Sequence, residues 1–340
     1  MLSLLVLLAQ APSPEPETPA PFDHVLLISV DGLRSDALLV DGGEGLPHFH
    51  RLMHGPHTLN ARCDPDYSVT LPNHTDMLTG RTVKGEGGHG WTSNARPKNG
   101  ETLVDHDGRV IEGVFHHTSA AGIPDALIAS KPKFWLFPDS WNPAGGTRWM
   151  DVMMIEKDVE VQMEAAFAML DPEKHARSFT FLHLRGPDDA GHDGGWDMTP
   201  GSKYLESVRE ADRQIGRLLH HIDSDPVLRE RTAVVVTTDH GGGVPFKNHH
   251  GHGMMWVNTV IPLFVHYDAA PEVHLYAVTR NSRRDPGLDP VARVEGQLPP
   301  IRNGDVGNLC LALLGLEPME GSTLNVGQDL SRGLGISTRR

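Results

Sequence analysis

The stretch HVLLISVDGLRSD, residues 24–36, decides the fold class of this 340-residue chain. Its first seven residues, HVLLISV (24–30), form a short apolar run bounded by polar residues, as buried parallel strands usually do. The run stops at Asp31, and the following Gly32 makes an Asp-Gly pair that is typical of a turn. The stretch therefore predicts a buried strand with an acidic side chain at its carboxyl end.

The rest of the chain repeats this kind of run and places helical patterns between the repeats. Apolar runs recur at SFTFLHL (178–184), TAVVVTT (232–238) and VIPLFVHY (260–267), and helical spacing is seen over 158–170, 201–222 and 304–316. Strands that alternate with helices predict an α/β fold, a mostly parallel central sheet with helices on both faces. Residues 95–150 are rich in Gly, Pro, His and Trp without clean periodicity, which predicts a small inserted lobe or set of loops that faces the substrate.

The composition narrows the possible partners. Lys and Arg total 30 against 44 Asp and Glu, a formal net charge of −14. This balance argues against a nucleic-acid polymer as ligand, because phosphate backbones are bound by positive charge. A small phosphorylated substrate remains possible where bound cations reverse the local field. The two cysteines, Cys63 and Cys310, are interpreted as separate thiols in preference to a disulfide.

The N-terminal segment predicts export. Residues 2–8 are apolar, AQA (9–11) resembles a cleavage site, and residues 12–21 are rich in proline. We interpret 1–22 as a signal peptide with a linker, which predicts a secreted or periplasmic protein. No basic residue precedes the apolar run, so a disordered start of a cytoplasmic protein is the alternative. We assign 23–330 to one catalytic domain and 331–340 to a tail, and no segment reaches transmembrane length.

Acidic and imidazole side chains follow three of the predicted strands. Asp31 follows the first, Asp188 and His192 follow the second, and Asp239 and His240 follow the third. In open α/β sheets, ligands bind beyond the carboxyl ends of the strands. Each residue alone would suit an ordinary turn or a solvated surface. Together the carboxylates would repel each other, and a pair of divalent cations, with zinc favoured by mixed nitrogen and oxygen ligands, would compensate.

A histidine-rich segment, KNHHGHGMMW (247–256), offers one more ligand. We expect His252, which is flanked by glycines, to complete the metal set, with His250 second and His249 third. The alternative is a histidine-rich surface loop without a metal.

The segment YSVTLPNHTDMLTG (67–80) contains a threonine at the apparent start of a helix. Pro72 suits the first helical turn. Thr70 has two interpretations, a residue that caps the helix or a nucleophile whose hydroxyl is activated by a metal. The metal set favours the second.

Six segments, taken in order, carry a family resemblance. They are LISVDGLRSD (27–36), TLPNHTDMLTGR (70–81), HGWTSN (89–94), PDDAGH (187–192), TTDHGG (237–242) and GHG (251–253). Over roughly 24–330 the chain resembles the alkaline phosphatase superfamily, specifically its type I phosphodiesterase/nucleotide pyrophosphatase family. The resemblance implies an alkaline phosphatase-like three-layer sandwich, two zinc ions in one site and a covalent intermediate on a threonine or serine.

Residue by residue, the resemblance implies a role for each matching position. Thr70 would be the nucleophile, and Asn94 would donate a hydrogen bond to a phosphate oxygen of the substrate. The remaining positions are metal ligands: Asp31, Asp239 and His240 would bind one zinc, which Thr70 would face, and Asp188, His192 and His252 would bind the other.

Three departures bear on these roles. Leu71 replaces a common aromatic residue, which alters the pocket wall. Asp189 next to Asp188 leaves the ligand assignment open by one position. The formylglycine signature of sulfatases is missing, which argues against the usual sulfatase route.

The sequence thus predicts a metal-dependent hydrolase of phosphodiester or nucleotide pyrophosphate bonds that acts through a phosphothreonine on a small phosphorylated or nucleotide-like substrate. The alternatives are a phosphomonoesterase, a sulfatase-like or phosphonate hydrolase at the same site, a phosphoryl transferase, and a degenerate zinc-binding surface module without catalysis. Substrate choice is expected to depend on the 95–150 segment, with its Lys131, Lys133, Trp135, Trp141 and Trp149.

Overall fold

The computed structural model describes residues 20–142, 146–251, 255–293 and 296–336. The predicted signal segment therefore lies almost entirely outside the described residues, as do His252 and the last four residues of the predicted tail. The fold is built on one seven-stranded sheet in the order β2-β7-β6-β1-β5-β3-β4. The strands are β1 His24–Val30, β2 His57–Arg62, β3 Asp125–Ala129, β4 Val152–Ile155, β5 Ser178–Leu184, β6 Thr232–Thr237 and β7 Val260–His266.

The sheet is mostly parallel, as predicted. Strand β1 pairs in parallel with β5 and β6, and β3 pairs in parallel with β5 and β4. Strand β7 pairs antiparallel with both β6 and β2. The carboxyl ends of β6, β1, β5 and β3 consequently meet at one edge of the sheet.

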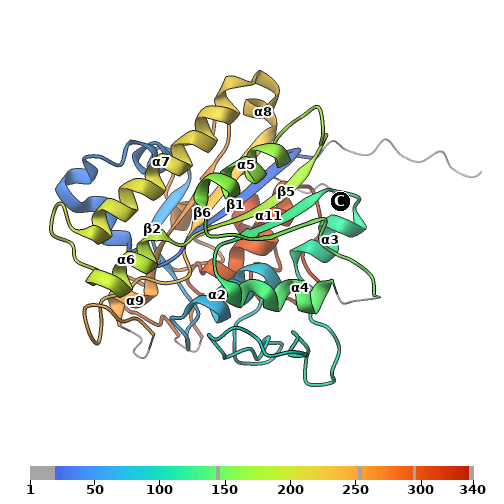
Figure 1. Ribbon diagram of the computed structural model, residues 1–340, viewed down its shortest axis with the longest axis horizontal. Coiled ribbons are helices and arrows are strands. Elements are labelled where there is room, and N and C mark those ends of the chain that lie inside the picture. The colour runs from blue at the N-terminus through green and yellow to red at the C-terminus, as the bar shows by residue number, and fades with distance from the viewer. Residues whose placement is uncertain (1–19, 143–145, 252–254, 294–295, 337–340) are drawn as a thin grey trace, which may run out of the picture.

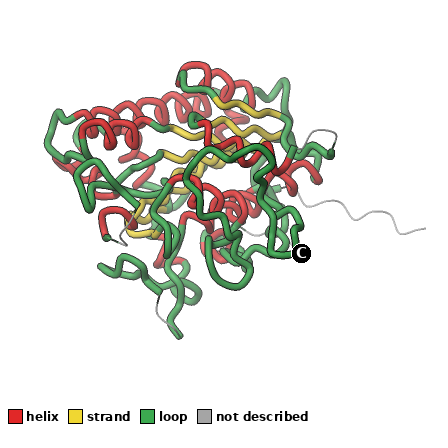
Figure 2. Tube along the Cα trace, turned by 60° about the horizontal axis from the view of Figure 1, so that its bottom comes forward, coloured by secondary structure: helices red, strands yellow, loops and turns green. Residues whose placement is uncertain are grey.

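Helices cover both faces of the sheet, which gives three layers (Figure 1). Side chains alternate along each strand, so Val25 and Leu27 face one apolar core, whereas Leu26 and Ile28 face the other. Figure 2 shows the strands side by side between helices, with the loops gathered in the lower part of the view. The α-helices are α1 Pro47–Met53, α2 Thr70–Thr79, α3 Val114–Ala120, α4 Leu136–Trp141, α5 Val159–Met169, α6 Gly186–Gly194, α7 Lys203–Ser224, α8 Pro226–Arg231, α9 Trp256–Thr259, α10 Leu275–Val278, α11 Val306–Leu313 and α12 Asp329–Gly333, and the 3-10 helices are η1 Ser35–Gly43, η2 Pro132–Trp135 and η3 Asn303–Asp305.

The longest helix, α7, has the apolar spacing and the capping residue by which a helix is predicted from a sequence. Apolar residues recur along it at helical spacing, and Ser202 caps its start by accepting a hydrogen bond from the Leu205 N–H at 3.2 Å. Its buried side packs into the core that also contains α1 and α5. The two cysteines are buried and free, as predicted.

The segment 95–150 differs in part from the predicted lobe of loops. Residues 125–129 form β3, a fully buried strand that pairs with β5 inside the main sheet. A five-residue strand buried on both faces lacks the alternation that reveals strands in a sequence. The tryptophans of this segment also differ in setting: Trp141 is fully buried in the core, Trp149 stacks on His116, and Trp135 is 36% exposed.

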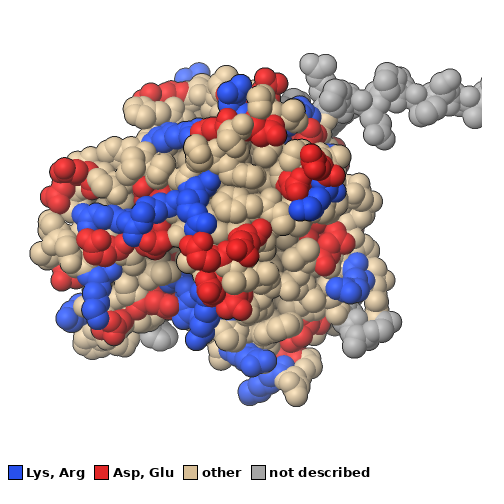
Figure 3. All heavy atoms as spheres, turned by 45° about the horizontal axis from the view of Figure 1, so that its top comes forward, with Lys and Arg blue, Asp and Glu red and all other residues tan. Residues whose placement is uncertain are grey.

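Among the described residues, no helix has both the length and the apolar character needed to cross a membrane. On the face shown in Figure 3, acidic and basic side chains are interspersed.

Candidate metal centre

The candidate site lies at the carboxyl ends of three adjacent strands. Asp31 directly follows β1, Asp188 lies in α6 just beyond β5, and Asp239 follows β6 by two residues. The Asp31 N–H donates to the Leu184 carbonyl at 2.9 Å, and the Gly32 N–H donates to Asp239 Oδ1 at 3.1 Å. The backbone just past β1 is thus tied to both neighbouring strands, and the three carboxylates are brought to one place.

Gly32 permits the close approach of two of these acids. Its φ is +73°, and a Cβ atom added there would lie 2.9 Å from the Asp188 Cα. A larger residue would therefore be strained by its backbone and would also push Asp188 away. The Asp-Gly pair is consequently more than a turn signal, because it sets the spacing between Asp31 and Asp188.

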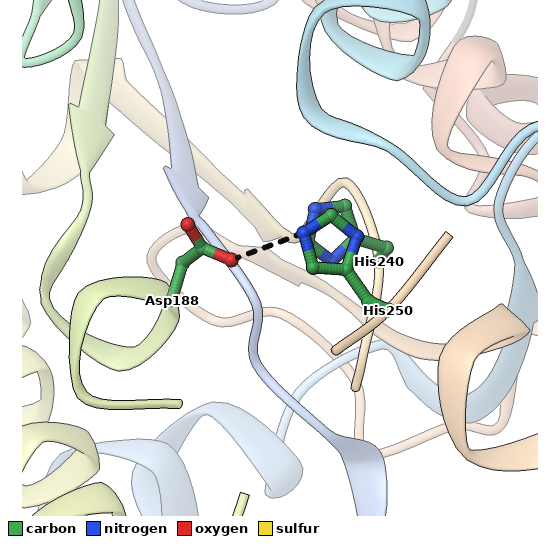
Figure 4. A group of neighbouring side chains, drawn as sticks. All are labelled: Asp188, His240 and His250. Atoms are coloured by element: carbon green, nitrogen blue, oxygen red, sulfur yellow. Dashed lines mark ion pairs between the residues drawn. The ribbon is translucent and has the colours of Figure 1, made fainter. Parts of the chain in front are cut away.

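The first group of candidate ligands, called the Asp188 set, contains Asp188, His192 and His250. The Asp188 Oδ1 lies 3.4 Å from His192 Nε2 and 3.6 Å from His250 Nε2, and the two imidazole nitrogens are 3.1 Å apart. Figure 4 shows Asp188 with His250 and the neighbouring His240, with the imidazole rings pointing toward the carboxylate. Asp188 Oδ1, His192 Nε2 and His250 Nε2 thus lie within 3.1–3.6 Å of one another.

The second group, called the Asp31 set, contains Asp31, Asp239 and His240. The His240 Nε2 lies 3.2 Å from Asp239 Oδ2 and 3.7 Å from Asp31 Oδ1. All three residues are buried, and each offers one ligand atom within 4.8 Å of the other two. The separations in both sets suit zinc, because ligands held at about 2.1 Å from a tetrahedral ion lie about 3.4 Å from each other.

The three carboxylates share one hydrogen-bonding pattern. Asp31 and Asp188 engage their Oδ2 atoms with protein donors, and Asp239 engages its Oδ1 atom. The other oxygen of each acid is buried and lacks a hydrogen-bond partner in the described part of the chain. Orphaned buried oxygens are costly unless a ligand satisfies them, and these are the atoms that face the imidazoles. The residues present therefore fit a pair of cations.

The three histidines are fixed in a matching way. The Nδ1 atoms of His192, His240 and His250 contact the backbone carbonyls of Asn248, Gly241 and Ser68, at 3.1, 2.7 and 2.8 Å. An imidazole that donates through Nδ1 leaves Nε2 unprotonated, which is the form that binds a metal. Burial lowers the pKa of His240, and burial and the neighbouring His240 lower the pKa of His250 to about 2. Both rings are therefore neutral at physiological pH.

The buried acids carry opposite pKa shifts. Burial raises the pKa of Asp31, but the Lys131 ammonium and His183 outweigh it and hold that pKa well below its usual range. Burial and the charge of Asp31 raise the pKa of Asp239 well above its usual range. The raised pKa of Asp239 reflects its burial and its repulsion from Asp31, and a cation bound between the two carboxylates would relieve that repulsion.

Thr70 lies at the start of α2, close to the Asp31 set. Its carbonyl accepts a hydrogen bond from His74 Nδ1 at 2.8 Å, and the same nitrogen is 3.6 Å from Asp239 Oδ2. The cap position of α2 is Val69 and not Thr70, so the capping interpretation of Thr70 is wrong. Thr70 is buried, with 1% of its surface exposed.

Asn94 lies against the same helix start. Its Oδ1 accepts hydrogen bonds from the Leu71 N–H at 2.9 Å and from Lys133 Nζ at 3.0 Å. With Oδ1 held by two donors, the amide nitrogen is the part of the side chain left to donate to a ligand.

The structure separates residues that the sequence left as alternatives. His250 lies in the Asp188 set, whereas His249 is exposed and contacts its neighbour Asn248. The expected His252 is outside the described residues. Asp188 is buried in the site, while the exposed Asp189 forms an ion pair with Arg185 at 2.6 Å.

Two further residues of the site were not assigned a role from the sequence. His183 Nε2 donates to Asp31 Oδ2 at 2.8 Å, and Lys131 Nζ contacts the Oδ2 atoms of Asp31 and Asp188. His183 lies within the apolar run of β5, where nothing distinguished it from a core residue. From the sequence, Lys131 is expected only in the segment that governs substrate choice, because the pattern of residues 125–129 does not predict the strand β3 that precedes it.

Comparison with known proteins gives short sequence matches and broad structural ones. The chain is 38% identical over 73 residues to 2,3-bisphosphoglycerate-independent phosphoglycerate mutase from Thermococcus kodakarensis, covering 22% of this chain and 15% of that protein. It is 29% identical over 147 residues to the enzyme of the same name from Sulfurisphaera tokodaii, covering 43% of this chain and 30% of that protein. The chain thus spans less than a third of the length of these curated relatives.

A solved alkaline phosphatase superfamily protein from Vibrio parahaemolyticus shares the fold. It superposes with a TM-score of 0.59 at 12% identity, covering 91% of this chain and 71% of that one. The likeness confirms the predicted alkaline phosphatase-like architecture. Residues 25–292 match the model of the type I phosphodiesterase / nucleotide pyrophosphatase family. This match covers most of the chain, and the chain belongs to the type I phosphodiesterase/nucleotide pyrophosphatase family.

Proposed function

We propose that this protein is a metal-dependent hydrolase that cleaves phosphodiester or nucleotide pyrophosphate bonds through a phosphothreonine on Thr70. One observation carries the proposal. In Asp31, Asp188, Asp239 and His240, one polar side-chain atom is hydrogen-bonded, and the other is buried with no hydrogen-bond partner among the described residues. Family membership supports a phosphoric ester as the substrate.

The proposed cofactors are two divalent cations, with zinc favoured by the mixed nitrogen and oxygen ligands. Asp188, His192 and His250 would hold one cation, and Asp31, Asp239 and His240 would hold the other, with Thr70 facing it. When bound, such cations lower the pKa of a nearby hydroxyl and neutralise charge on phosphoryl oxygens.

The chain's own residues supply the nucleophile and position the substrate. In the first step, a bond forms between Thr70 Oγ and phosphorus while the bond to the leaving group breaks, and the hydroxyl proton passes to water. In the second step, a water oxygen bonds to phosphorus, the bond to Thr70 Oγ breaks, and the threonine regains a proton. Asn94 would donate through its amide nitrogen to a phosphoryl oxygen, since its Oδ1 is already held by Leu71 and Lys133.

The helix that begins with Thr70 adds to anion binding. Helix α2 has ten residues, and its N-terminal backbone N–H groups carry partial positive charge. A phosphoryl group in line with the Thr70 hydroxyl would lie near this helix end, where anions are favoured.

The test uses Thr70→Ala with Thr70→Ser as the matched control. The alanine variant should lose turnover by at least about 10³-fold while it still binds both metal ions, and the serine variant should retain measurable turnover. A radiolabelled phosphate ester should leave label on wild-type protein after rapid acid quench and leave none on the alanine variant. Turnover of the alanine variant at the wild-type rate would refute the nucleophile assignment.

A phosphomonoesterase is the second candidate, and Lys133 favours it. This half-buried lysine contacts the Oδ1 of Asn94 at 3.0 Å, which adds a cation beside the proposed phosphate-binding amide. A phosphomonoester carries about one more negative charge than a diester at neutral pH, so an extra cation favours it. Rates on bis-p-nitrophenyl phosphate, p-nitrophenyl phosphate and p-nitrophenyl sulfate separate diesterase, monoesterase and sulfatase activities.

The same panel tests the reading without catalysis. A degenerate zinc-binding module would bind zinc and turn over none of these esters. A small phosphorylated or nucleotide-like substrate is the proposed partner, and the secreted or periplasmic location stays a proposal. N-terminal sequencing of protein recovered from the native host checks whether the apolar segment that ends at AQA (9–11) is removed.

A further inference from the structure

Lys131 is a buried lysine within the candidate metal centre. It lies two residues beyond β3, and its side chain is 8% exposed. Its Nζ contacts the Oδ2 of Asp31 and, at 2.5 Å, the Oδ2 of Asp188. These acids belong to different sets, so one ammonium group connects the two halves of the site.

The lysine and the candidate metals use different oxygens of the same acids. Lys131 contacts only the Oδ2 atoms of Asp31 and Asp188, and the Oδ1 atoms are the ones that face the imidazoles of the two sets. The ammonium therefore does not compete for the ligand atoms. It fixes each carboxylate so that a single oxygen is presented to a cation.

The contact places a positive charge among three buried carboxylates. Asp31, Asp188 and Asp239 are at most 3% exposed, and like charges at short range in a buried site destabilise each other. Among the described residues, Lys131 is the only lysine or arginine that forms an ion pair with any of these three acids. His183 also donates to Asp31 through Nε2, but its Nδ1 accepts from the Ser130 N–H, so the ring supplies a hydrogen bond and no full charge.

We propose that Lys131 is a positioning residue that serves as a resident cation. It holds Asp31 and Asp188 apart at a fixed spacing, and it keeps both sets in metal-binding shape while no metal is bound. The proposal rests on the two-metal site of the proposed function and requires nothing about which ester is cleaved.

The test compares Lys131→Met, which keeps the length and removes the charge, with Lys131→Arg, which keeps the charge. Lys133→Met is the matched control, because Lys133 lies two residues away and contacts Asn94 instead of an acid. The thermal midpoint of each protein is measured after removal of metal with a chelator and again with saturating zinc. Zinc content is measured alongside.

The methionine variant should lose thermal stability mainly in the metal-free state. Its midpoint should rise more on zinc addition than that of wild type, because the metal now supplies the missing positive charge. Lys131→Arg should recover part of the metal-free stability, and Lys133→Met should match wild type in the size of the zinc response. A merely structural role for Lys131 would lower the metal-free and zinc-loaded midpoints equally.

Equal losses in both states, or no loss in either, overturn the proposal. It is also overturned if the metal-free midpoint is unchanged and only the binding of inorganic phosphate is weakened, since Lys131 would then act on substrate. Recovery of folded Lys131→Met only in the presence of zinc counts as the strongest form of the expected result.

A charge-balanced variant decides the case in which Lys131→Met does not fold at all. Asp188→Asn combined with Lys131→Met removes one charge of each sign, so the resident-cation proposal expects folded metal-free protein. Failure of this double variant to fold would refute it. These measurements use no substrate, so their failure is distinguishable from loss of the phosphothreonine mechanism, which the Thr70 variants test.

Discussion

The ring of His240 stacks on the ring of His250 with centroids 3.7 Å apart and an interplanar angle of 15°. His240 belongs to the Asp31 set and His250 to the Asp188 set, so the stack places the two candidate metal sets side by side. The contact joins the loop after β6 to the histidine-rich segment that follows it. Both rings are held from behind by backbone carbonyls, which fixes the direction of each Nε2.

The stack predicts that His250 is needed for full metal content. His250→Ala should remove the metal of the Asp188 set, because loss of a direct ligand costs more than the about 10–100-fold typical of outer partners. His249→Ala is the matched control, since His249 is exposed and contacts only neighbouring residues of its loop. Zinc content by mass spectrometry should fall by one ion in the first variant and stay constant in the second. His252→Ala, measured beside them, shows whether that residue also contributes, and unchanged zinc content in His250→Ala would contradict the assignment.

A second prediction concerns the hydrogen bond behind Asp31. His183→Leu removes the donor to Asp31 Oδ2 and replaces the imidazole with an apolar side chain of similar bulk. We expect zinc affinity of the Asp31 set to fall by about 10–100-fold, as for other outer partners of metal ligands. His24→Leu is the control, because His24 is buried at the opposite end of β1 and contacts Ser178. Competition titration with a zinc chelator checks both, and equal affinities in the two variants would exclude a role for His183 in positioning.

A third prediction tests the glycine run after β6. A Cβ at Gly242 would lie 2.2 Å from Trp196 Cε2, and Trp196 Nε1 donates to the Gly32 carbonyl at 2.9 Å. Gly242→Ala should therefore shift Trp196 and destabilise the protein by about 1–3 kcal/mol, as overpacked cores do. Gly327→Ala is the control, because nothing lies within 4 Å of its added Cβ and its φ is not positive. Urea unfolding monitored by tryptophan fluorescence should report a loss for Gly242→Ala, and a midpoint equal to that of the control would contradict it.

A fourth prediction concerns pH and lies outside the metal centre. Burial raises the pKa of Asp125 to about 7, although Thr118 Oγ1 donates to its Oδ2 at 2.6 Å. A raised carboxyl pKa means that the folded protein binds this proton more tightly than the unfolded chain. The contribution of Asp125 to stability is therefore greatest below about pH 4, decreases as the pH rises toward 7, and is constant above that.

Asp125→Asn should remove this part of the pH dependence. At about 1.4 kcal/mol per pKa unit, the loss between pH 4 and pH 7 is on the order of 2–4 kcal/mol in wild type. Asp151→Asn is the comparison, since Asp151 is exposed and contacts the Asp125 backbone N–H at 3.1 Å. Unfolding free energies at both pH values check the prediction, and a variant that keeps the wild-type slope would show that another group is responsible.

The longer elements of the fold could be predicted because their signals are local. The strand predicted over 24–30 is β1, and the run 178–184 is β5, since short runs of mostly apolar residues with turn or polar boundaries are typical of buried strands. The same reasoning missed β3, because its five residues are all buried and show no alternation of apolar and polar side chains. Without β3, the sequence could not predict that Lys131 lies at the carboxyl edge of the sheet, two residues after that strand.

The candidate site shows the same division. The sequence alone shows that acids and histidines follow three strands. It also predicts that these side chains lie near each other, because parallel strands in one sheet have their carboxyl ends at a common edge. Only the tertiary structure decided which atoms meet there: His250 beside Asp188, Asp189 turned to Arg185, and Lys131 between two acids that are 100 and 57 residues from it. Such contacts depend on side-chain direction and on the spacing between neighbouring strands, and neither leaves a mark in the order of residues along the chain.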